Sequence, residues 1–561
     1  MSLSEHSRTI RFAVAALMTT NLMLVAGCSV GPDFRLPEVP EPRSLAALEV
    51  IDQGTREMTD MTPATEWWKS FADPRLDELI VRALDNNQDL EVAKERIHQA
   101  RAARRVSSSL LVPQANGTLS ASRTSDSWWG RSEERGGGKP PITDFNKENV
   151  NTQSNYFLGG ETSWEMDVWG KNARGLESAR AEVLGAESAY RGVVLTLLAE
   201  VSLAYFDTMA SQEDLDILRE EVRNRQEFLK LVRTREENGL ASRLDTRRQE
   251  VEDANTRADL PLAEARVARA HFRLATLLGE NPQTFVLPEK KLKDYPLLPV
   301  IPEGLPIRLV RQRPDVMQKE FEMRAAAADI GVAIGEMLPR VQITGSAGFR
   351  SAESEEWFTS DADEWSIGSA LKVPLLDGGR TYAQLETRRS MYRGSVAAYR
   401  QQILTSLEEI NGSLVTAVKN RERRSALVEA SAAATDALRI AREQYRAGLI
   451  DLLDYLDAQR TELRARQVVV LADRTIVTDA VNMYRSLGGG WATDAADPVA
   501  PMDKSLPRTF AENFPLFAVG LTPEDRYYPE PPKSRRQAAP AADVSTQPAS
   551  EPAKGAAVVA P

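Results

Sequence analysis

The sequence predicts a mainly α-helical protein with a small β part, built as two copies of one supersecondary unit. Three observations lead to this prediction: an internal repeat that aligns without a gap, two long runs of coiled-coil periodicity, and four short segments in which apolar and polar residues alternate. The chain has 561 residues, of which 42% are hydrophobic, and is long enough to bury large cores.

The first 28 residues have the layout of a secretory signal. A polar start with two arginines precedes an apolar stretch of about fifteen residues, too short to cross a membrane as a helix. Ala26 and Gly27 stand before Cys28, the only cysteine, and resemble a bacterial lipobox. Ser29 takes the place of the aspartate that usually retains lipoproteins in the inner membrane. We expect residues 1–27 to be a signal peptide and Cys28 to be acylated at the outer membrane; the alternative is cleavage elsewhere with an incidental cysteine.

The body of the chain is duplicated. Residues 89–121 align with residues 315–347 without a gap, and GLASRLD at 239–245 matches GLIDLLD at 448–454. The number of residues that separates matching positions of the two copies decreases along the chain. The first copy therefore contains extra residues, and we expect them in loops. The expected divisions are a lipid-anchored segment (28–72), a first repeat (73–280), a linker (281–313), a second repeat (314–490) and a largely disordered extension (491–561).

Four segments alternate apolar and polar residues and are expected to be β-strands. In the third, Val341, Ile343 and Phe349 fall on one side, and Gln342 and Thr344 fall on the other. Each run has about ten residues, which suits a tilted transmembrane strand of about 9–11 residues. The strands are expected near residues 113–123, 155–167, 340–350 and 364–375.

Two long runs without proline carry apolar residues at alternating spacings of three and four, as in Val194, Leu198 and Val201. Each run ends before a glycine, Gly239 or Gly448, that can adopt the left-handed conformation and end a helix. A second helical run then leads back. Two antiparallel hairpins are expected, with helices near 173–237, 242–279, 380–446 and 450–487.

Four strands of membrane-spanning length cannot be stable alone, because hydrocarbon forbids open sheet edges and closed bacterial barrels have at least about eight strands. Two chains supply eight strands, whereas three supply twelve and leave room for a lumen. No further stretch of about eighteen apolar residues was found, so no membrane-spanning helix is expected. A wet lumen suits the hydrophilic strand residues Asn116, Thr118, Ser120, Glu161, Glu165, Gln342, Thr344 and Lys372.

Together these features resemble the TolC family, and most closely its NodT-like lipoprotein branch in resistance-nodulation-division (RND) efflux pumps. EWWKSFADPRLDELI (66–80), RPDV (313–316) and LP-x-V (338–341) carry the resemblance, with the lipobox and the duplicated hairpin. It covers roughly residues 28–490. It implies a homotrimer with a twelve-stranded barrel in the bacterial outer membrane and a helical barrel extending into the periplasm. An equatorial region that includes the linker and residues 50–72 surrounds the helical barrel.

The resemblance also implies a periplasmic gate in the second hairpin. Tyr445 matches a tyrosine that tethers neighbouring hairpins. Asp454 and Asp457 match positions that form carboxylate rings, and Asp245 matches the inner-helix aspartate of the first copy. Ile450 stands where TolC itself has an arginine that pairs across helices, so an aliphatic ring behind the aspartates is expected instead. The alternative is that these aspartates only cap helices.

The resemblance implies that the hairpin turns, Gly239-Leu240 and Gly448-Leu449, dock onto a periplasmic adaptor protein. The alternative is a plain turn whose leucine packs into the bundle. The other implied partners are an inner-membrane RND transporter and outer-membrane lipid. A net charge of −11 argues against nucleic acid.

The expected function is a passive outer-membrane channel for small molecules in a tripartite efflux pump. Alternatives are a type I secretion duct for polypeptides and a non-conducting periplasmic scaffold lipoprotein. The sequence has no nucleophile, base or metal cluster at useful spacing, so neither an enzyme nor a metal site is expected. No cofactor is expected beyond the lipid on Cys28.

Overall fold

The computed structural model describes residues 29–37, 66–127, 150–287, 292, 308–353, 355 and 359–490. The signal peptide, Cys28 and the extension 491–561 lie outside the described residues, and so do the predictions made for them. The elements, in chain order, are η1 (Trp67–Phe71), α3 (Pro74–Asn86), α4 (Gln88–Ser109), β1 (Gln114–Ser127), β2 (Val150–Met166), α5 (Lys171–Glu237), α6 (Arg243–Leu277), α7 (Arg308–Gln312), α8 (Pro314–Glu336), β3 (Arg340–Ser351), η3 (Ser360–Ala362), β4 (Asp363–Lys372), α9 (Arg380–Ala447), α10 (Leu452–Ser486) and η4 (Gly488–Gly490).

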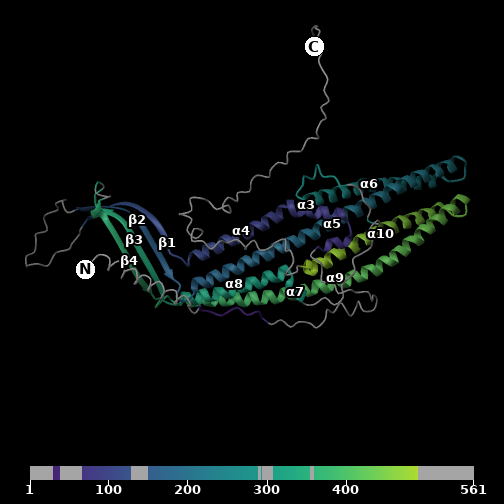
Figure 1. Cartoon of the computed structure of the whole chain (residues 1–561). Coiled ribbons are helices and arrows are strands. Elements are labelled where there is room, and N and C mark those ends of the chain that lie inside the picture. Colours follow the sequence, from purple (N-terminus) through teal and green to yellow (C-terminus); the bar gives the residue numbers. More distant parts are fainter. Residues whose placement is uncertain are drawn as a thin grey trace, which may run out of the picture. The chain divides into compact units, whose positions relative to one another are not determined.

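All four predicted strands and all four predicted long helices are present. The strands form one antiparallel sheet in the order β1-β2-β3-β4 (Figure 1). β1 and β2 extend further toward the loop that joins them than the alternation indicated. Within the described residues, β1 and β4 each pair along one side only, so both outer edges of the sheet are open.

The register separates an apolar face of the sheet from a polar face. Leu158 pairs with Leu119 on one side and Phe349 on the other, which makes an apolar row across three strands. Glu161 pairs in the same way with Asn116 and Ser346 and makes a polar row. Side chains of successive strand residues point to opposite faces, so these rows belong to opposite sides of the sheet.

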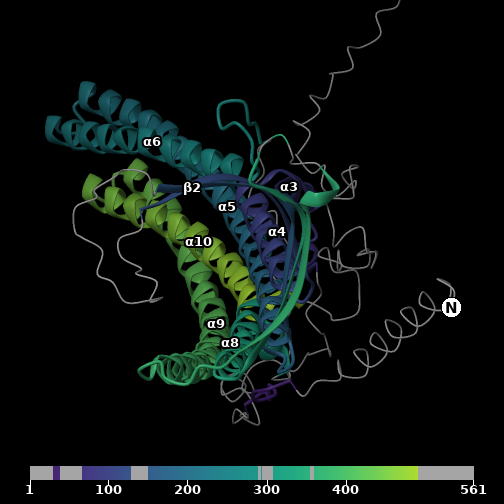
Figure 2. The same cartoon turned by 90° about the vertical axis from the view of Figure 1, so that its left-hand side faces the viewer.

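The helices follow the order of the strands. α4 leads into β1 and α5 follows β2, while α8 leads into β3 and α9 follows β4 (Figures 1 and 2). Near the sheet α4 packs on α5, α5 on α8 and α8 on α9. Away from the sheet α5 packs on α6 and α10, and α10 packs on α9. Each chain therefore supplies a layer of helices whose outermost members are α4 and α6 on one side and α9 on the other.

The main core lies where the two repeats meet. Trp67 stacks on Tyr484 with 5.3 Å between ring centroids, so the short η1 is packed against the end of α10. Asp73 caps α3 by accepting a hydrogen bond from the Arg75 amide (3.1 Å), and it accepts another from the buried Tyr205 hydroxyl (2.6 Å). Pro74 takes the first position of α3, where the missing amide hydrogen of proline costs no helical hydrogen bond.

One long helix contains an apolar stretch that was not expected from the sequence. α5 contains an 18-residue window with a mean hydropathy of 1.5, long and apolar enough to cross a membrane by composition, and 72% of that window is buried. Val194, Leu198, Val201 and Tyr205 of α5 all belong to the main core. The expectation that no such stretch exists is therefore wrong, and the burial is typical of the core helix of a helical bundle.

Residues 29–37 lie along α5 and α8 at the ends nearest the sheet. The Val30 amide donates to the Trp169 carbonyl (3.0 Å), and Arg174 donates to the Val30 carbonyl (3.1 Å) and pairs with Asp33 (2.8 Å). Gly170, the N-cap of α5, approaches Ser29 so closely that a Cβ there would lie 2.9 Å from the Ser29 Cα. This segment is called the N-terminal strap below.

Candidate functional site at the hairpin tips

Each hairpin turns on a glycine with positive φ. Gly239 (φ 76°) follows the end of α5, where the Leu240 amide donates to the Arg235 carbonyl (2.7 Å) and the Gly239 amide donates to the Glu236 carbonyl (2.9 Å). This pair of bonds is the Schellman motif, which satisfies the last carbonyls of a helix and requires a left-handed residue.

The second hairpin repeats the motif. Gly448 (φ 75°) donates to the Tyr445 carbonyl (3.0 Å), and the Leu449 amide donates to the Gln444 carbonyl (2.9 Å). The leucine that follows each glycine is 69% exposed at Leu240 and 74% exposed at Leu449. In this chain neither leucine packs into the bundle, so both turns present an apolar side chain at the tip.

An aromatic cluster joins the two hairpins directly above these turns. The Phe228 ring stacks on Tyr455 (3.9 Å between centroids) and contacts Tyr445 (5.3 Å). Ile450 packs partly buried against the same side chains. This tip cluster consists of Phe228 and Val232 of α5, Ala441 and Tyr445 of α9, and Leu452, Tyr455 and Leu456 of α10.

Arg235 ties the first hairpin to the end of α9. Its guanidinium lies 5.0 Å from the centre of the Tyr445 ring and donates from Nη1 to the Tyr445 carbonyl (2.9 Å). A cation is favoured at a helix C-terminus, where carbonyls are unpaired and the helix dipole is negative. Sequence analysis missed Arg235 because 210 positions separate it from its partner and no local pattern connects them.

The structure divides the three predicted aspartates between two environments. Asp245 forms a capping box with Ser242 at the start of α6 and lies 3.9 Å from the Arg248 guanidinium. Asp454 and Asp457 are exposed in the first turns of α10, and within the described residues the Asp454 carboxylate forms no ion pair and no hydrogen bond. Burial raises the pKa of the Tyr445 hydroxyl; the positive charge of Arg235 opposes this shift and the negative charge of Asp245 adds to it.

Farther from the turns, charged side chains are buried between the hairpins. Arg225 is 2% exposed and donates to Glu221 (2.6 Å) and to Glu252 of α6 (2.8 Å). Arg460 of α10 bonds to the same Glu252, and Arg466 reaches Glu220 of α5 (2.7 Å). This interhairpin network couples α5, α6 and α10, and breaking one partner of a buried pair is costly.

Glu462 of α10 makes the stability of this network depend on pH. Burial raises the pKa of Glu462, with Arg466 opposing the effect and Glu220 adding to it. A carboxyl group with a raised pKa stabilises the fold most below its ordinary value of about 4.3, and this contribution is lost as the pH rises through the folded-state pKa. Glu462→Gln is therefore expected to raise the thermal midpoint at neutral pH and flatten its dependence on pH. Thermal unfolding measured at pH values from the ordinary carboxyl pKa up to neutral pH tests this prediction. A thermal midpoint that depends on pH as strongly in Glu462→Gln as in the unmodified chain contradicts it.

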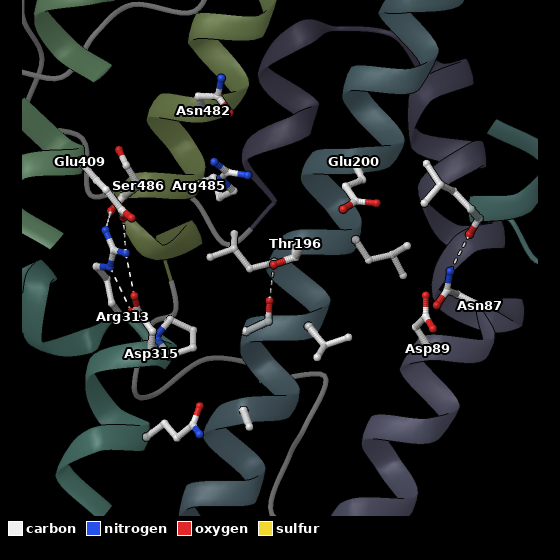
Figure 3. A pocket seen from close by; sticks show the side chains of 18 of the residues that line it. Asn87, Asp89, Thr196, Glu200, Arg313, Asp315, Glu409, Asn482, Arg485 and Ser486 are labelled. Atoms are coloured by element: carbon white, nitrogen blue, oxygen red, sulfur yellow. Dashed lines mark hydrogen bonds and ion pairs between the residues drawn. The ribbon is translucent and has the colours of Figure 1, made fainter. Parts of the chain in front are cut away.

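A cavity of about 730 Å³ lies where α4, α5, α8, α9 and α10 meet (Figure 3). Arg313 in its wall is 6% exposed and donates to Asp315 (2.7 Å), Glu409 (2.6 Å) and the Ser486 carbonyl (2.6 Å). Its guanidinium is bound to α8, α9 and α10 of the second repeat, so Arg313 holds these helices together and does not await a ligand.

Comparison with known proteins decides the family. The family described as outer membrane efflux protein matches residues 79–280 and 305–489, which together cover more than half of the chain. The chain belongs to the outer membrane efflux protein family. The resemblance found in the sequence is thereby confirmed, with the outer-membrane location and the efflux channel function.

Individual relatives agree with this assignment. The chain is 28% identical over 492 residues to the probable outer membrane lipoprotein SilC of Salmonella typhimurium, covering 86% of this chain and 99% of that protein. It is 28% identical over 492 residues to nodulation protein T of Rhizobium leguminosarum bv. viciae, covering 86% and 94%. The solved outer-membrane channel OprN is similar with a TM-score of 0.71 and 31% identity, covering 83% of this chain and all of that one. The predicted TolC-like fold is confirmed.

Proposed function

We propose that three copies of the chain close a twelve-stranded barrel and serve as the passive exit channel of a tripartite efflux pump, without catalysing a reaction. The open edges of β1 and β4 carry this proposal, because hydrocarbon does not tolerate unpaired edges and neighbouring copies supply the missing partners. The polar row through Glu161 then faces the lumen, and the apolar row through Leu158 faces lipid.

The hairpin tips are the proposed gate and docking surface. The exposed carboxylates of Asp454 and Asp457 come together around a three-fold axis, where like charges repel and attract cations. The tip cluster, including Tyr445 and Ile450, holds the two hairpins of each copy together behind them. Leu240 and Leu449 offer apolar anchors to a periplasmic adaptor, which connects the channel to an inner-membrane RND transporter.

The N-terminal strap supports lipid attachment at Cys28. Ser29, the next residue, contacts Gly170 at the junction of sheet and helices. An acyl group on Cys28 at that position enters the leaflet beside the barrel. The intact mass of the purified mature chain tests this attachment, and a mass without acyl chains contradicts it.

Conductance in planar bilayers tests the channel. The purified trimer is expected to conduct, and Asp454→Ala is expected to change its cation selectivity and raise its leak, because a ring of three charges is removed from the axis. Asp245→Ala tests the third aspartate predicted for the gate, and Glu429→Ala, which removes an exposed carboxylate of α9 away from the tips, is the control.

Two outcomes separate the alternatives. A trimer that never conducts, even as Asp454→Ala, favours a periplasmic scaffold. A channel that conducts and supports polypeptide secretion but confers no small-molecule resistance favours a type I secretion duct. An unchanged leak in Asp454→Ala places the constriction elsewhere.

A further inference from the structure

Basic residues are concentrated at the membrane ends of the two edge helices α4 and α9, although the chain as a whole is acidic. Residues 96–109, in α4, contain four arginines and no acidic residue. Residues 380–400, at the start of α9, contain five arginines and one glutamate. The whole chain has a net charge of −11, so the charge of these two segments is opposite in sign to the charge of the chain.

Three of these arginines, Arg105 of α4 with Arg389 and Arg393 of α9, are exposed and form what we call the basic band. Among the described residues, none of the three forms an ion pair with a carboxylate. Arg393 donates to the Ser390 hydroxyl (2.9 Å), which leaves the positive charge uncompensated. A guanidinium presents a planar set of donors that matches phosphate oxygens.

Apolar side chains lie between the basic band and the sheet. Leu375 and Leu376 follow β4 and are 89% and 95% exposed. Tyr382 in the first turn of α9 is 59% exposed and lies seven residues before Arg389, on the same side of the helix. Apolar and aromatic side chains on the membrane side with arginines behind them are the pattern of a protein surface at the lipid headgroups.

The position of the N-terminal strap indicates how far the basic band lies from the membrane leaflet that holds the proposed lipid anchor. Ser29 contacts Gly170, which precedes the first residue of α5, so the lipid proposed for Cys28 enters the bilayer at the level of the helix starts. Arg389 is nine residues into α9, or about 14 Å below that level at 1.5 Å per residue. Its side chain leans back toward the helix N-terminus, and the headgroup layer is about 5–8 Å thick, so the guanidinium lies within reach of lipid phosphates.

We propose that the basic band binds the phosphate of an anionic phospholipid in the leaflet that holds the Cys28 acyl chains. The inference rests on the membrane orientation given under Proposed function, but it depends neither on the gate nor on a protein partner. Leu375, Leu376 and Tyr382 contact the glycerol and upper acyl region, while Arg389, Arg393 and the Arg105 of a neighbouring copy surround the phosphate.

Native mass spectrometry of the purified trimer, titrated with phosphatidylglycerol or phosphatidylcholine, tests the proposal. The unmodified trimer is expected to bind phosphatidylglycerol at least 10-fold more tightly than phosphatidylcholine. Removing one basic residue at a membrane surface weakens binding by about 5-fold, so R389Q/R393Q is expected to lose about 25-fold for phosphatidylglycerol and little for phosphatidylcholine. The double variant R423Q/R464Q is the control, because it removes two exposed arginines farther from the membrane.

The outcomes discriminate the possible occupants. Equal binding of both lipids, or an unchanged phosphatidylglycerol affinity in R389Q/R393Q, overturns the proposal. Competition by glycerol 3-phosphate alone identifies a soluble phosphate ligand and also overturns it. Loss of the trimer itself in R389Q/R393Q assigns the band to contacts between copies, and R105Q then repeats the lipid comparison on the other helix. Lipid preference in a trimer that does not conduct refutes the channel but not this site.

Discussion

Arg313→Ala is expected to lower the free energy of unfolding by about 1.5–3 kcal/mol, the usual range for hydrogen bonds to charged groups, because the Asp315 and Glu409 side chains are 40% and 50% exposed and water can solvate them in the variant. Arg313 is 6% exposed, and its guanidinium is the common partner of Asp315, Glu409 and the Ser486 carbonyl. Its removal leaves two carboxylates and the end of α10 without their shared donor. Thermal and denaturant unfolding of the purified trimer measure the loss.

Two variants show whether geometry or charge carries this effect. Arg313→Lys keeps the positive charge but cannot form the two parallel bonds to Asp315, so it is expected to recover only part of the loss. Arg423→Ala, an exposed arginine of α9, is expected to change stability by less than about 0.5 kcal/mol. A similar stability for Arg313→Ala and the unmodified chain contradicts the assignment of Arg313 as the link between α8, α9 and α10.

The elements and turns of this fold were predictable because their signals are local. Heptad spacing along residues 173–237 and 380–446 predicts helices that the structure places at Lys171–Glu237 and Arg380–Ala447. Gly239 and Gly448 predict the two turns, since a Schellman motif requires a residue that accepts positive φ. Strand alternation likewise predicts which side chains share a face of the sheet.

The long-range contacts were not predictable, because they pair residues more than 170 positions apart. Arg313 meets the Ser486 carbonyl and Arg235 meets the Tyr445 carbonyl across such separations. The alternation of apolar and polar residues does not predict the position of Phe157, an apolar residue on the polar face of the sheet. There it is 5% exposed, because Gly159 leaves room for the ring: a Cβ at Gly159 would lie 2.6 Å from its Cζ. The guanidinium of Arg350 covers it at 4.7 Å.

The candidate site shows the same division between local and distant signals. Asp454 and Asp457 are exposed at the start of α10, where the family resemblance indicated them, whereas the capping box explains Asp245 by local chemistry. Tyr445 packs between hairpins of its own chain, against Phe228 and Tyr455. The hydrophobic partners of the gate residues thus come from both repeats, and a pattern within one repeat could not name them.

Arg235→Ala is expected to raise the leak conductance of the trimer about 30-fold or more. The variant loses a charged hydrogen bond to the end of α9, worth about 1.5–3 kcal/mol, and a cation–π contact with Tyr445, worth about 0.5–1 kcal/mol. If these contacts exist only while the tips are together, a loss of about 2 kcal/mol shifts the ratio of open to closed tips by about 30-fold. Single-channel recording and sensitivity to large antibiotics measure the change.

Arg233 provides a matched control for the role of Arg235. It lies on the same helix and pairs with Glu250 (2.8 Å), but both members of that pair belong to the first hairpin. Arg233→Ala therefore removes an arginine and an ion pair from the tip without cutting a link between hairpins. Leaks that rise equally in both variants would mean that net charge at the tip controls the pore. A leak that rises only in Arg235→Ala means that the two hairpins of one chain must separate for the channel to open, because Arg235, unlike Arg233, has contacts that cross from one hairpin to the other.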